Sequence, residues 1–237
     1  MVPYKHYSFD LWLTLIKSNP RFKKQRSIYF HQQFNSLSRP LEEVEHIFRQ
    51  VDVMCNTINE RTGKNIDADE MYLMVISQIN RASFSLHDVD MNALYQTMEV
   101  LLLENAPLLY CDNTANVLSH LKDKSAGLNI LSNTGFIKGI TLRKVLSMLG
   151  IIDHFDFQLY SDETGYSKPN KLFFDMMLQQ ANGLRNLTPT EIIHVGDNSH
   201  ADIGGAKTIG IHSLLINSNN TFITKLLDHV PEEILTA

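Results

Sequence analysis

Short apolar runs lie along the chain, and each ends in polar or small residues. The runs are YSFDLWLTLI (7–16), LNILSN (128–133), FDFQLYS (155–161), IIHVGD (192–197) and HSLLIN (212–217). Segments with helical periodicity separate the later runs, for example Ile137 to Leu149 and Leu172 to Ala181. Strands that alternate with helices pair in parallel and carry helices on both faces. We therefore predict an α/β core of three layers with a mainly parallel sheet.

The segment from residue 17 to residue 105 has a different pattern. Its apolar residues recur at three- and four-residue steps, as between Val44 and Met54 and between Met91 and Leu102, which is typical of amphipathic helices. Turn-forming residues at 38–40, 63–65 and 85–88 divide the segment into about four helices, and residues 105–107 close it. We predict an all-helical domain at 17–105 and an α/β domain formed by 1–16 and 106–237.

Composition narrows the classes of partner. The chain has 237 residues, of which 43% are apolar and 20% charged, as in ordinary globular proteins. Its formal net charge of -5 argues against a nucleic-acid or anionic membrane partner, because both need concentrated positive charge. The one short basic run contains Arg21, Lys23, Lys24 and Arg26, and we interpret it as a solvated helix face.

Cysteine usage and hydropathy bear on the compartment. Cys55 and Cys111 are far apart and have no metal-ligand spacing, so a disulfide framework is not indicated and a reducing compartment fits. Neither a signal sequence nor an apolar stretch of about 18 residues, the length of a membrane span, is found. We expect a cytoplasmic protein without a membrane partner. The sequence leaves the oligomeric state open.

Polar side chains stand at the ends of several predicted strands, where open parallel sheets bind their ligands. Asp10 ends the first run in FDLWLTL, Ser132 follows the second in ILSNTGF, and Asp197 opens VGDNSHADIGGAKTIGI. Lys168 lies between them in SDETGYSKPNKLFF. Any one of these residues alone is most simply a turn, cap or surface residue. Their order and spacing together indicate a site.

This ordered set of four motifs resembles the haloacid dehalogenase-like hydrolase superfamily. The resemblance covers residues 5–16 and 106–217, and it implies a Rossmann-like core. The helical insert resembles the cap domain of that superfamily in its placement and composition. The resemblance further implies that Asp10 is a nucleophile that forms an aspartyl-phosphate. A carboxylate suits this task because it is ionised at neutral pH and attacks phosphorus without first losing a proton.

Mg²⁺ is the cofactor that the resemblance implies. A phosphate dianion is repelled by the Asp10 carboxylate unless positive charge intervenes, and Mg²⁺ with oxygen ligands supplies that charge. The implied ligands are the carboxylates of Asp10 and Asp197 and the backbone carbonyl of Trp12. Asn198 and Asp202 belong to the same metal loop, where they bind the ion or fix the loop.

The transferred phosphoryl group also needs hydrogen-bond donors and a cation. The resemblance assigns these roles to Ser132 and Asn133, at the end of the second predicted strand, and to Lys168. A helix that begins after such a turn favours bound phosphate at its N-terminus. The lysine ammonium is a compact positive charge near both the nucleophile and the phosphoryl group.

Trp12 departs from the family pattern. Phosphatases of the superfamily read DxDxTL, and the second aspartate protonates the leaving oxygen and then helps water to attack. Indole performs neither task, and general acid–base catalysis contributes about 10²- to 10⁴-fold. An acid from the helical insert is one replacement, and Asp67, Asp69 and Glu70 are the candidates there.

Three functions remain open at this point. We favour a Mg²⁺-dependent hydrolase that acts on a small phosphorylated metabolite. A 2-haloacid dehalogenase is the first alternative, because dehalogenases of the family carry an aromatic residue at the position of Trp12 and need no leaving-group proton. Asp197 opposes it, because such dehalogenases generally lack this acid and bind no Mg²⁺. A catalytically impaired protein that binds phosphate or a metabolite is the second alternative.

Overall fold

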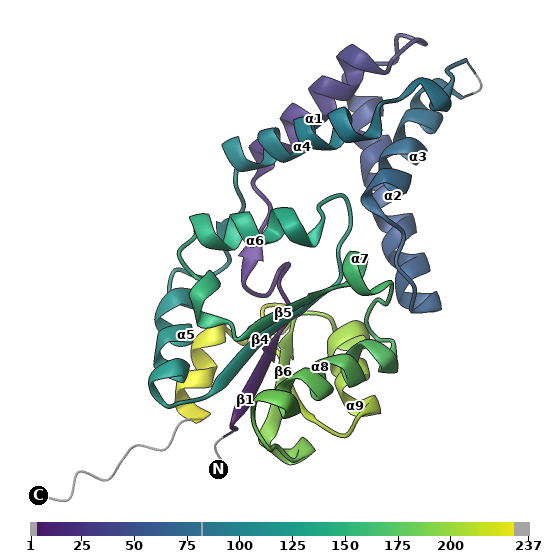
Figure 1. Ribbon diagram of the computed structural model, residues 1–237. Coiled ribbons are helices and arrows are strands. Elements are labelled where there is room, and N and C mark those ends of the chain that lie inside the picture. Colours follow the sequence, from purple (N-terminus) through teal and green to yellow (C-terminus); the bar gives the residue numbers. More distant parts are fainter. Residues whose placement is uncertain (1–3, 82, 230–237) are drawn as a thin grey trace, which may run out of the picture.

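The computed structural model describes residues 4–81 and 83–229 (Figure 1). Within them, five strands form one sheet in the order β5-β4-β1-β6-β7, and every neighbouring pair is parallel. The strands are β1 (His6–Phe9), β4 (Gly127–Ser132), β5 (Phe157–Tyr160), β6 (Ile192–Gly196) and β7 (His212–Leu215). Each predicted apolar run overlaps one of these strands, so the predicted parallel sheet is confirmed.

Helices cover both faces of the sheet and complete the three layers (Figure 1). The α-helices of this part are α5 (Thr114–Asp123), α6 (Gly139–Met148), α7 (Ser161–Thr164), α8 (Lys171–Leu184) and α9 (Gly205–Thr208). Adjacent residues of β4 face opposite sides, because strand side chains alternate. Ile130 joins a cluster with residues of α5 and α6, whereas Leu131 packs with Phe173 and Phe174 of α8.

The chain between β2 and β3 is helical. It contains α1 (Pro20–Gln33), α2 (Leu41–Thr62), α3 (Ala68–Asn80), a short 3₁₀ helix (Leu86–Asp88) and α4 (Met91–Glu104). The helix boundaries follow local signals. Pro20 occupies the first position of α1, and Gly63 ends α2 in the left-handed conformation with φ 66°. The predicted helices and the breaks between them are confirmed.

A two-stranded antiparallel ribbon lies where the chain leaves the sheet for the helices and where it returns. Its strands are β2 (Ile16–Lys17) and β3 (Leu108–Leu109). The ribbon adjoins the domain boundaries that we predict at residues 17 and 105. Of the predicted α/β domain, residues 1–3 and 230–237 lie outside the described residues.

Aromatic rings join the helical segment to the loop after β4. Phe136, in that loop, lies with its ring centroid 5.4 Å from that of Phe48 in α2 and 5.0 Å from that of Tyr72 in α3. The Tyr72 hydroxyl donates a hydrogen bond to the Phe136 carbonyl at 3.1 Å. A second connection forms at the end of α2, where the Gly63 carbonyl accepts from Asn170 Nδ2 at 2.9 Å. The helices therefore lie over the carboxyl edge of the sheet.

Two smaller observations concern the compartment. Cys55 is buried, Cys111 is half-buried, and both are free thiols. Among the described residues, no helix combines the length and the apolar character that crossing a membrane requires.

Candidate active site

Asp10 directly follows β1, and two side chains hold its carboxylate. Lys168 Nζ donates to Asp10 Oδ1 at 2.7 Å, and Thr14 Oγ1 donates to Asp10 Oδ2 at 2.8 Å. The Asp10 residue is only 6% exposed. Burial raises the pKa of Asp10 and the Asp202 carboxylate adds to the rise, whereas Lys168 and Thr14 oppose it. Both oxygens are thus oriented before any ligand binds.

The loop after Asp10 folds back so that Thr14 reaches it. The Leu11 carbonyl accepts from the Leu15 amide at 2.9 Å, and Leu13 adopts a positive φ of 60°. Such a conformation costs a non-glycine residue of order 1 kcal/mol or more, so the surroundings must hold it. Asn217, beyond β7, does so by donating to the carbonyls of Leu13 at 2.7 Å and Thr14 at 3.1 Å.

Asp202 is fixed by a network that begins on β6. Its Oδ1 accepts from Lys168 Nζ at 2.7 Å and lies 3.1 Å from His194 Nε2, and its Oδ2 accepts from the Asn198 amide at 3.0 Å. Gly196 makes this approach possible, because a Cβ atom there would lie 2.1 Å from Asp202 Oδ2. Burial raises the pKa of Asp202, but Lys168 and His194 outweigh it and hold the pKa well below its usual range.

Asp197 completes a group of three carboxylates. One oxygen each of Asp10, Asp197 and Asp202 lies within 4.8 Å of the others. Burial, together with the charges of Asp10 and Asp202, raises the pKa of Asp197 to about 7. For Lys168, burial lowers the pKa, but the attraction of Asp10 and Asp202 is greater and raises it overall. One ammonium therefore contacts two of the three carboxylates.

The donor set of this acidic group suits a hard divalent cation. Mg²⁺ prefers oxygen ligands, and the group offers carboxylates alone. Burial first, and then the charges of Asp10 and Asp202, raise the pKa of Asp197, and a bound cation would oppose this rise. The Trp12 carbonyl is also available, since no hydrogen bond among the described residues ends on it. Asp10, Trp12 and Asp197 therefore fit the metal-binding role that the sequence predicts, and Asp202 adjoins them.

The loop after β4 is tied to Lys168. Asn133 forms a reciprocal pair with the backbone of Lys168: its Oδ1 accepts from the amide at 2.7 Å, and its Nδ2 donates to the carbonyl at 3.1 Å. Ser132 is fully buried, and its hydroxyl donates to the neighbouring Asn133 carbonyl at 3.1 Å. The cavity at the site is lined by Asn133 and Thr134 but not, within the described part of the chain, by Ser132.

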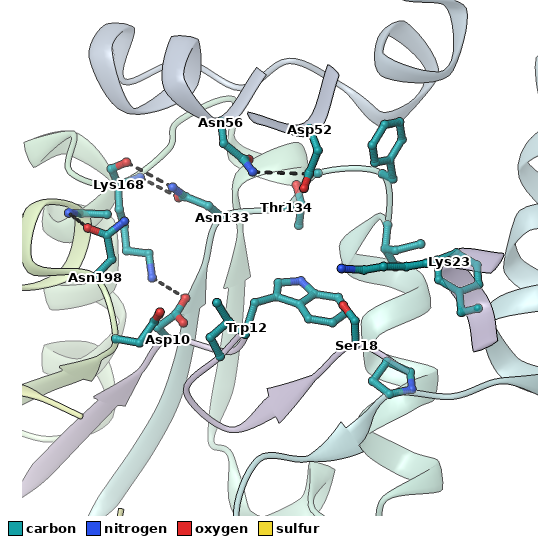
Figure 2. Close-up of a pocket in the computed structure, with 18 of the residues that line it drawn as sticks. Asp10, Trp12, Ser18, Lys23, Asp52, Asn56, Asn133, Thr134, Lys168 and Asn198 are labelled. Carbon is teal, nitrogen blue, oxygen red and sulfur yellow. Dashed lines mark hydrogen bonds and ion pairs between the residues drawn. The ribbon is translucent and has the colours of Figure 1, made fainter. Parts of the chain in front are cut away.

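A cavity of about 360 Å³ opens above these groups, between the sheet and the helices. Asp10, Lys168 and Asn198 lie at one end, Lys23 at the other, and the Trp12 indole between them (Figure 2). Its size is typical of a site for a small molecule.

Helix α2 contributes Arg49 to the cavity and, at four-residue steps, Asp52, Asn56 and Glu60. This spacing places them on one face of the helix. Glu60 Oε1 accepts from Asn198 Nδ2 at 2.9 Å, so α2 reaches the metal loop directly. Figure 2 shows Asp52 and Asn56 pointing from α2 into the cavity.

The insert acids that the sequence suggests as replacement catalysts lie elsewhere. Asp67 and Glu70 form the capping box of α3, and Asp69 pairs with Lys138 at 2.8 Å. None of the three lines the cavity of the described chain. The structure therefore does not support these candidates, and a capping signal and a catalytic acid look alike in a sequence.

Sequence reasoning also missed Thr14 and His194. The position of Thr14, four residues after Asp10, was a usable signal because it coincides with the threonine of the family motif. His194 is recognisable only in the structure, where it lies between Ser8 Oγ at 3.0 Å and Asp202 Oδ1 at 3.1 Å.

The chain is similar in sequence to known proteins. Haloacid dehalogenase-like hydrolase domain-containing protein 3 from Homo sapiens is 32% identical over 122 residues, which are 52% of this chain and 45% of that protein. Ribulose-1,5-bisphosphate 5-phosphatase from Halopiger xanaduensis is 28% identical over 177 residues, 74% of this chain and 70% of that protein. The aligned part spans about half the length of the human protein. It also spans about half the length of a glyceraldehyde 3-phosphate phosphatase from Methanothermobacter thermautotrophicus.

Solved structures share the fold. The HAD-hydrolase YfnB from Bacillus subtilis, solved bound to magnesium in a study that describes interdomain movement, has a TM-score of 0.68. It is 19% identical, and the match covers 92% of this chain and 91% of that one. The family model of haloacid dehalogenase-like hydrolases matches residues 9–216. The chain therefore belongs to the haloacid dehalogenase-like hydrolase family.

Proposed function

We propose that the protein is a Mg²⁺-dependent phosphatase that acts on a small phosphorylated metabolite through an aspartyl-phosphate on Asp10. The observation that carries the proposal is the buried arrangement of Asp10 with Lys168 and Asp202, beside Asp197. The similarity to a ribulose-1,5-bisphosphate 5-phosphatase supports it. The acidic group supports it further, because three carboxylates near an anionic substrate are costly without a cation.

Asp10 acts as the nucleophile. An oxygen of its carboxylate attacks phosphorus, and the bond from phosphorus to the leaving oxygen breaks. Thr14 and Lys168 hold the carboxylate, which prevents its rotation away from the substrate. Bound Mg²⁺ supplies positive charge that offsets the repulsion between the phosphate and the acids. Water then attacks the aspartyl-phosphate, and inorganic phosphate and the Asp10 carboxylate are released.

Lys168 and the loop after β4 stabilise the transferred group. The Lys168 ammonium contacts Asp10 and Asp202, so it is held where charge develops on the phosphoryl oxygens. Asn133 fixes the Lys168 backbone, which makes it a positioning residue as well as a candidate phosphate ligand. We retain Ser132, at the end of β4, as a phosphate-binding residue; its hydroxyl would turn from the Asn133 carbonyl to donate to the phosphate.

The proton for the leaving group requires a residue other than Trp12. We assign this role to Asp52 of α2, which lines the cavity. Its Oδ1 lies 4.0 Å from the position that a Cβ of Gly135 would take, so the carboxylate lies against the loop after β4. Glu60, the other α2 carboxylate of the cavity, accepts a 2.9 Å hydrogen bond from Asn198. Asp52, in contrast, has only longer contacts among the described residues, with Arg49 at 3.6 Å and Asn56 at 3.4 Å.

The helical segment acts as a cap. We propose that residues 17–105 form a domain that closes over a core of 1–16 and 106–237, with the β2–β3 ribbon as the hinge. The polar face of α2 and its contact with Asn198 support this role. A closed cap excludes water and selects the substrate.

Dehalogenation is the second candidate, and Trp12 is the observation that favours it. Displacing halide needs no leaving-group proton, so the aromatic residue carries no penalty there. The acidic group favours phosphoryl chemistry instead. A non-catalytic protein that binds phosphate or a metabolite is a third candidate, which keeps the same side chains for affinity.

One assay separates these candidates. The purified protein is incubated with aryl, acyl and alkyl phosphates and with 2-haloacids, in Mg²⁺ and in chelator. We expect phosphate release that requires Mg²⁺ and is abolished in Asp10→Asn. Halide release that is insensitive to chelator would replace the proposal with dehalogenation. Tight phosphate binding without turnover of any class would identify a binding protein.

A further inference from the structure

The basic run at the start of α1 is solvated only in part, because Arg21, Lys23 and Lys24 are exposed but Arg26 is buried. Lys24 is exposed and pairs with Glu45 of α2 at 2.9 Å, which fits the sequence-based interpretation. Lys23 and Arg26, in contrast, line the cavity, and Arg26 is only 8% exposed. Residues three apart lie on the same side of a helix, so the two cations face the cavity together.

Aromatic rings enclose the Arg26 guanidinium. Its Cζ atom lies 4.0 Å from the ring centroid of Phe48, 4.6 Å from that of Phe136 and 5.4 Å from that of Phe22. Cation–π contacts of this kind hold the group in one orientation without neutralising it. Phe48 and Phe136 come from α2 and the loop after β4, so the packing of three segments creates the pocket for this one side chain.

Arg26 has no anionic partner within the described residues. Its Nε is buried without a hydrogen-bond acceptor, and its polar neighbours are the neutral Tyr72 hydroxyl and the Asp52 carboxylate, which forms no ion pair with it. Asp52, the nearby acid, pairs instead with Arg49 at 3.6 Å. A buried charge is normally paired, because removing it from water is costly. The guanidinium fork therefore lacks the group that its geometry suits, a carboxylate or a phosphate.

The cavity separates two charged ends. Asp10, Lys168 and the acidic group occupy the sheet end, and Lys23 lies across the cavity with the Trp12 indole between (Figure 2). A substrate whose phosphate reaches Asp10 thus extends along Trp12 toward the cations of α1. The flat indole offers an apolar surface for the body of such a molecule, because its face needs no hydrogen-bond partner.

We propose that Lys23 and Arg26 form a subsite for a second anionic group on the substrate, either a carboxylate or a second phosphate. The preferred substrates are then small molecules with a phosphate at one end and another anion at the other. This inference rests on the proposed phosphatase activity, since it takes the Asp10 end as the place of the transferred phosphate. Arg26 provides the directed contact, and the exposed Lys23 adds charge at the same end.

The test uses three-carbon phosphates that differ only at the far end: 3-hydroxypropyl phosphate, 3-(phosphonooxy)propanoate and propane-1,3-diyl bisphosphate. We expect wild-type kcat/KM to be at least about tenfold higher for the two anionic compounds than for the neutral one, and about tenfold corresponds to about 1.4 kcal/mol. The ratio between the carboxylate and the bisphosphate identifies which second anion the subsite prefers. Equal kcat/KM for all three compounds would overturn the subsite.

Arg26→Met keeps an unbranched side chain against the aromatic rings and removes the charge. We expect KM for the two anionic compounds to rise about tenfold or more, with the neutral compound changed less than about twofold. Lys23→Met should give a smaller loss of the same kind. Lys24→Met is the matched control, because Lys24 lies on the same helix outside the cavity lining. Equal losses on all three compounds would show that Arg26 only supports the fold, which would overturn the subsite.

Two further measurements keep the test decisive. If Arg26→Met does not fold, Arg26→Lys retains a charge but not the fork, and we expect it to lose the preference for the anionic compounds in part. Phosphate release from p-nitrophenyl phosphate, which has one anionic group, reports the phosphatase activity separately. Without any phosphate release, calorimetric titration of propane-1,3-diyl bisphosphate decides the subsite alone. Equal affinity in wild type and Arg26→Met would then refute it.

Discussion

The ammonium of Lys168 lies 2.7 Å from Oδ1 of Asp10, and both side chains are buried. The same nitrogen lies 2.7 Å from Asp202 Oδ1, so one cation serves two acids that come from β1 and from the segment after β6. These contacts tie the proposed catalytic residues to the stability of the fold, because each of the three charges is costly in the absence of the others.

Lys168→Met is expected to destabilise the protein by about 3–5 kcal/mol, because it leaves two buried carboxylates without their cation. Urea denaturation measures the loss. Mg²⁺ should restore part of it, since a cation at the acidic group replaces some of the missing positive charge. Lys171→Met is the control three residues away, where an exposed pair with Asp175 contributes less than about 1 kcal/mol. Losses of equal size in the two variants would contradict this account.

Stability should also depend on pH through Asp197. Burial, with Asp10 and Asp202, raises its pKa to about 7 in the folded protein, from 3.8 in an unperturbed carboxyl. A raised carboxyl pKa favours the folded state below the unfolded pKa, and this contribution is lost as pH rises through the folded value. The metal-free protein should therefore lose stability between about pH 4 and pH 7. Asp197→Asn should flatten that part of the stability curve.

Mg²⁺ should reverse this loss of stability with rising pH, because the ion binds the deprotonated Asp197 carboxylate. We expect the stabilisation by Mg²⁺ to grow as pH rises toward about 7 and to be largely absent in Asp197→Asn. Thermal unfolding with Mg²⁺ and with chelator over this range measures the effect. A Mg²⁺ response in Asp197→Asn equal to that of wild type would remove Asp197 from the metal site.

The elements that local patterns determine were predictable from the sequence. Apolar runs marked every strand of the main sheet, and the turn residues around Gly63 marked the end of α2. The β2–β3 ribbon was not predictable, because a two-residue strand is too short to show alternation. Its strands are also separated by the entire helical segment.

The site residues that directly follow strands were predictable from the sequence. The residues whose place in the cavity depends on helix packing were not. The motif around Asp10 and Lys168 brought these two residues together correctly. Arg26 looked solvated, since Phe48 and Phe136, which cover it, are distant in the sequence. Asp52 lines the cavity and Asp67 does not. This difference likewise depends on which face α2 turns toward the sheet, and a single sequence contains no signal for that rotation.

Gly196→Ala tests the close approach of Asp202 to β6. A methyl group at this position would lie 2.1 Å from Asp202 Oδ2, so the carboxylate must move away from the Asn198 amide. We expect a loss of about 1–3 kcal/mol, as for overpacking in a core. Gly183→Ala is the matched control in α8, where an added Cβ meets nothing within 4 Å. It should stabilise the protein by about 0.5–1 kcal/mol, because glycine is unfavourable in helices.

The two glycine variants should also differ in Mg²⁺ response and turnover. Gly196→Ala disturbs the acidic group and should weaken both, whereas Gly183→Ala should change neither. Denaturation and phosphate release, measured on the same preparations, separate the effects. Equal stability changes of the same sign would show that the approach of Asp202 is not tight in solution.

Asp52→Asn tests the source of the leaving-group proton. Alkyl alkoxides leave poorly without protonation, so we expect turnover of an alkyl phosphate to fall by about 10²-fold or more. Turnover of p-nitrophenyl phosphate should fall much less, because its leaving group departs as a stable anion. Glu60→Gln is the control, since Glu60 is the other α2 carboxylate that lines the cavity.

Trp12→Asp completes this test by placing an acid at the position where the family motif has one. If Asp52 performs the task of the missing aspartate, Trp12→Asp should raise alkyl phosphate turnover in the Asp52→Asn background by about tenfold or more, and by a smaller factor in wild type. The difference between the two factors measures how far the two acids replace each other. Circular dichroism establishes that both variants are folded. An unchanged alkyl-to-aryl ratio in Asp52→Asn, together with equal gains from Trp12→Asp in both backgrounds, would show that Asp52 does not carry the proton.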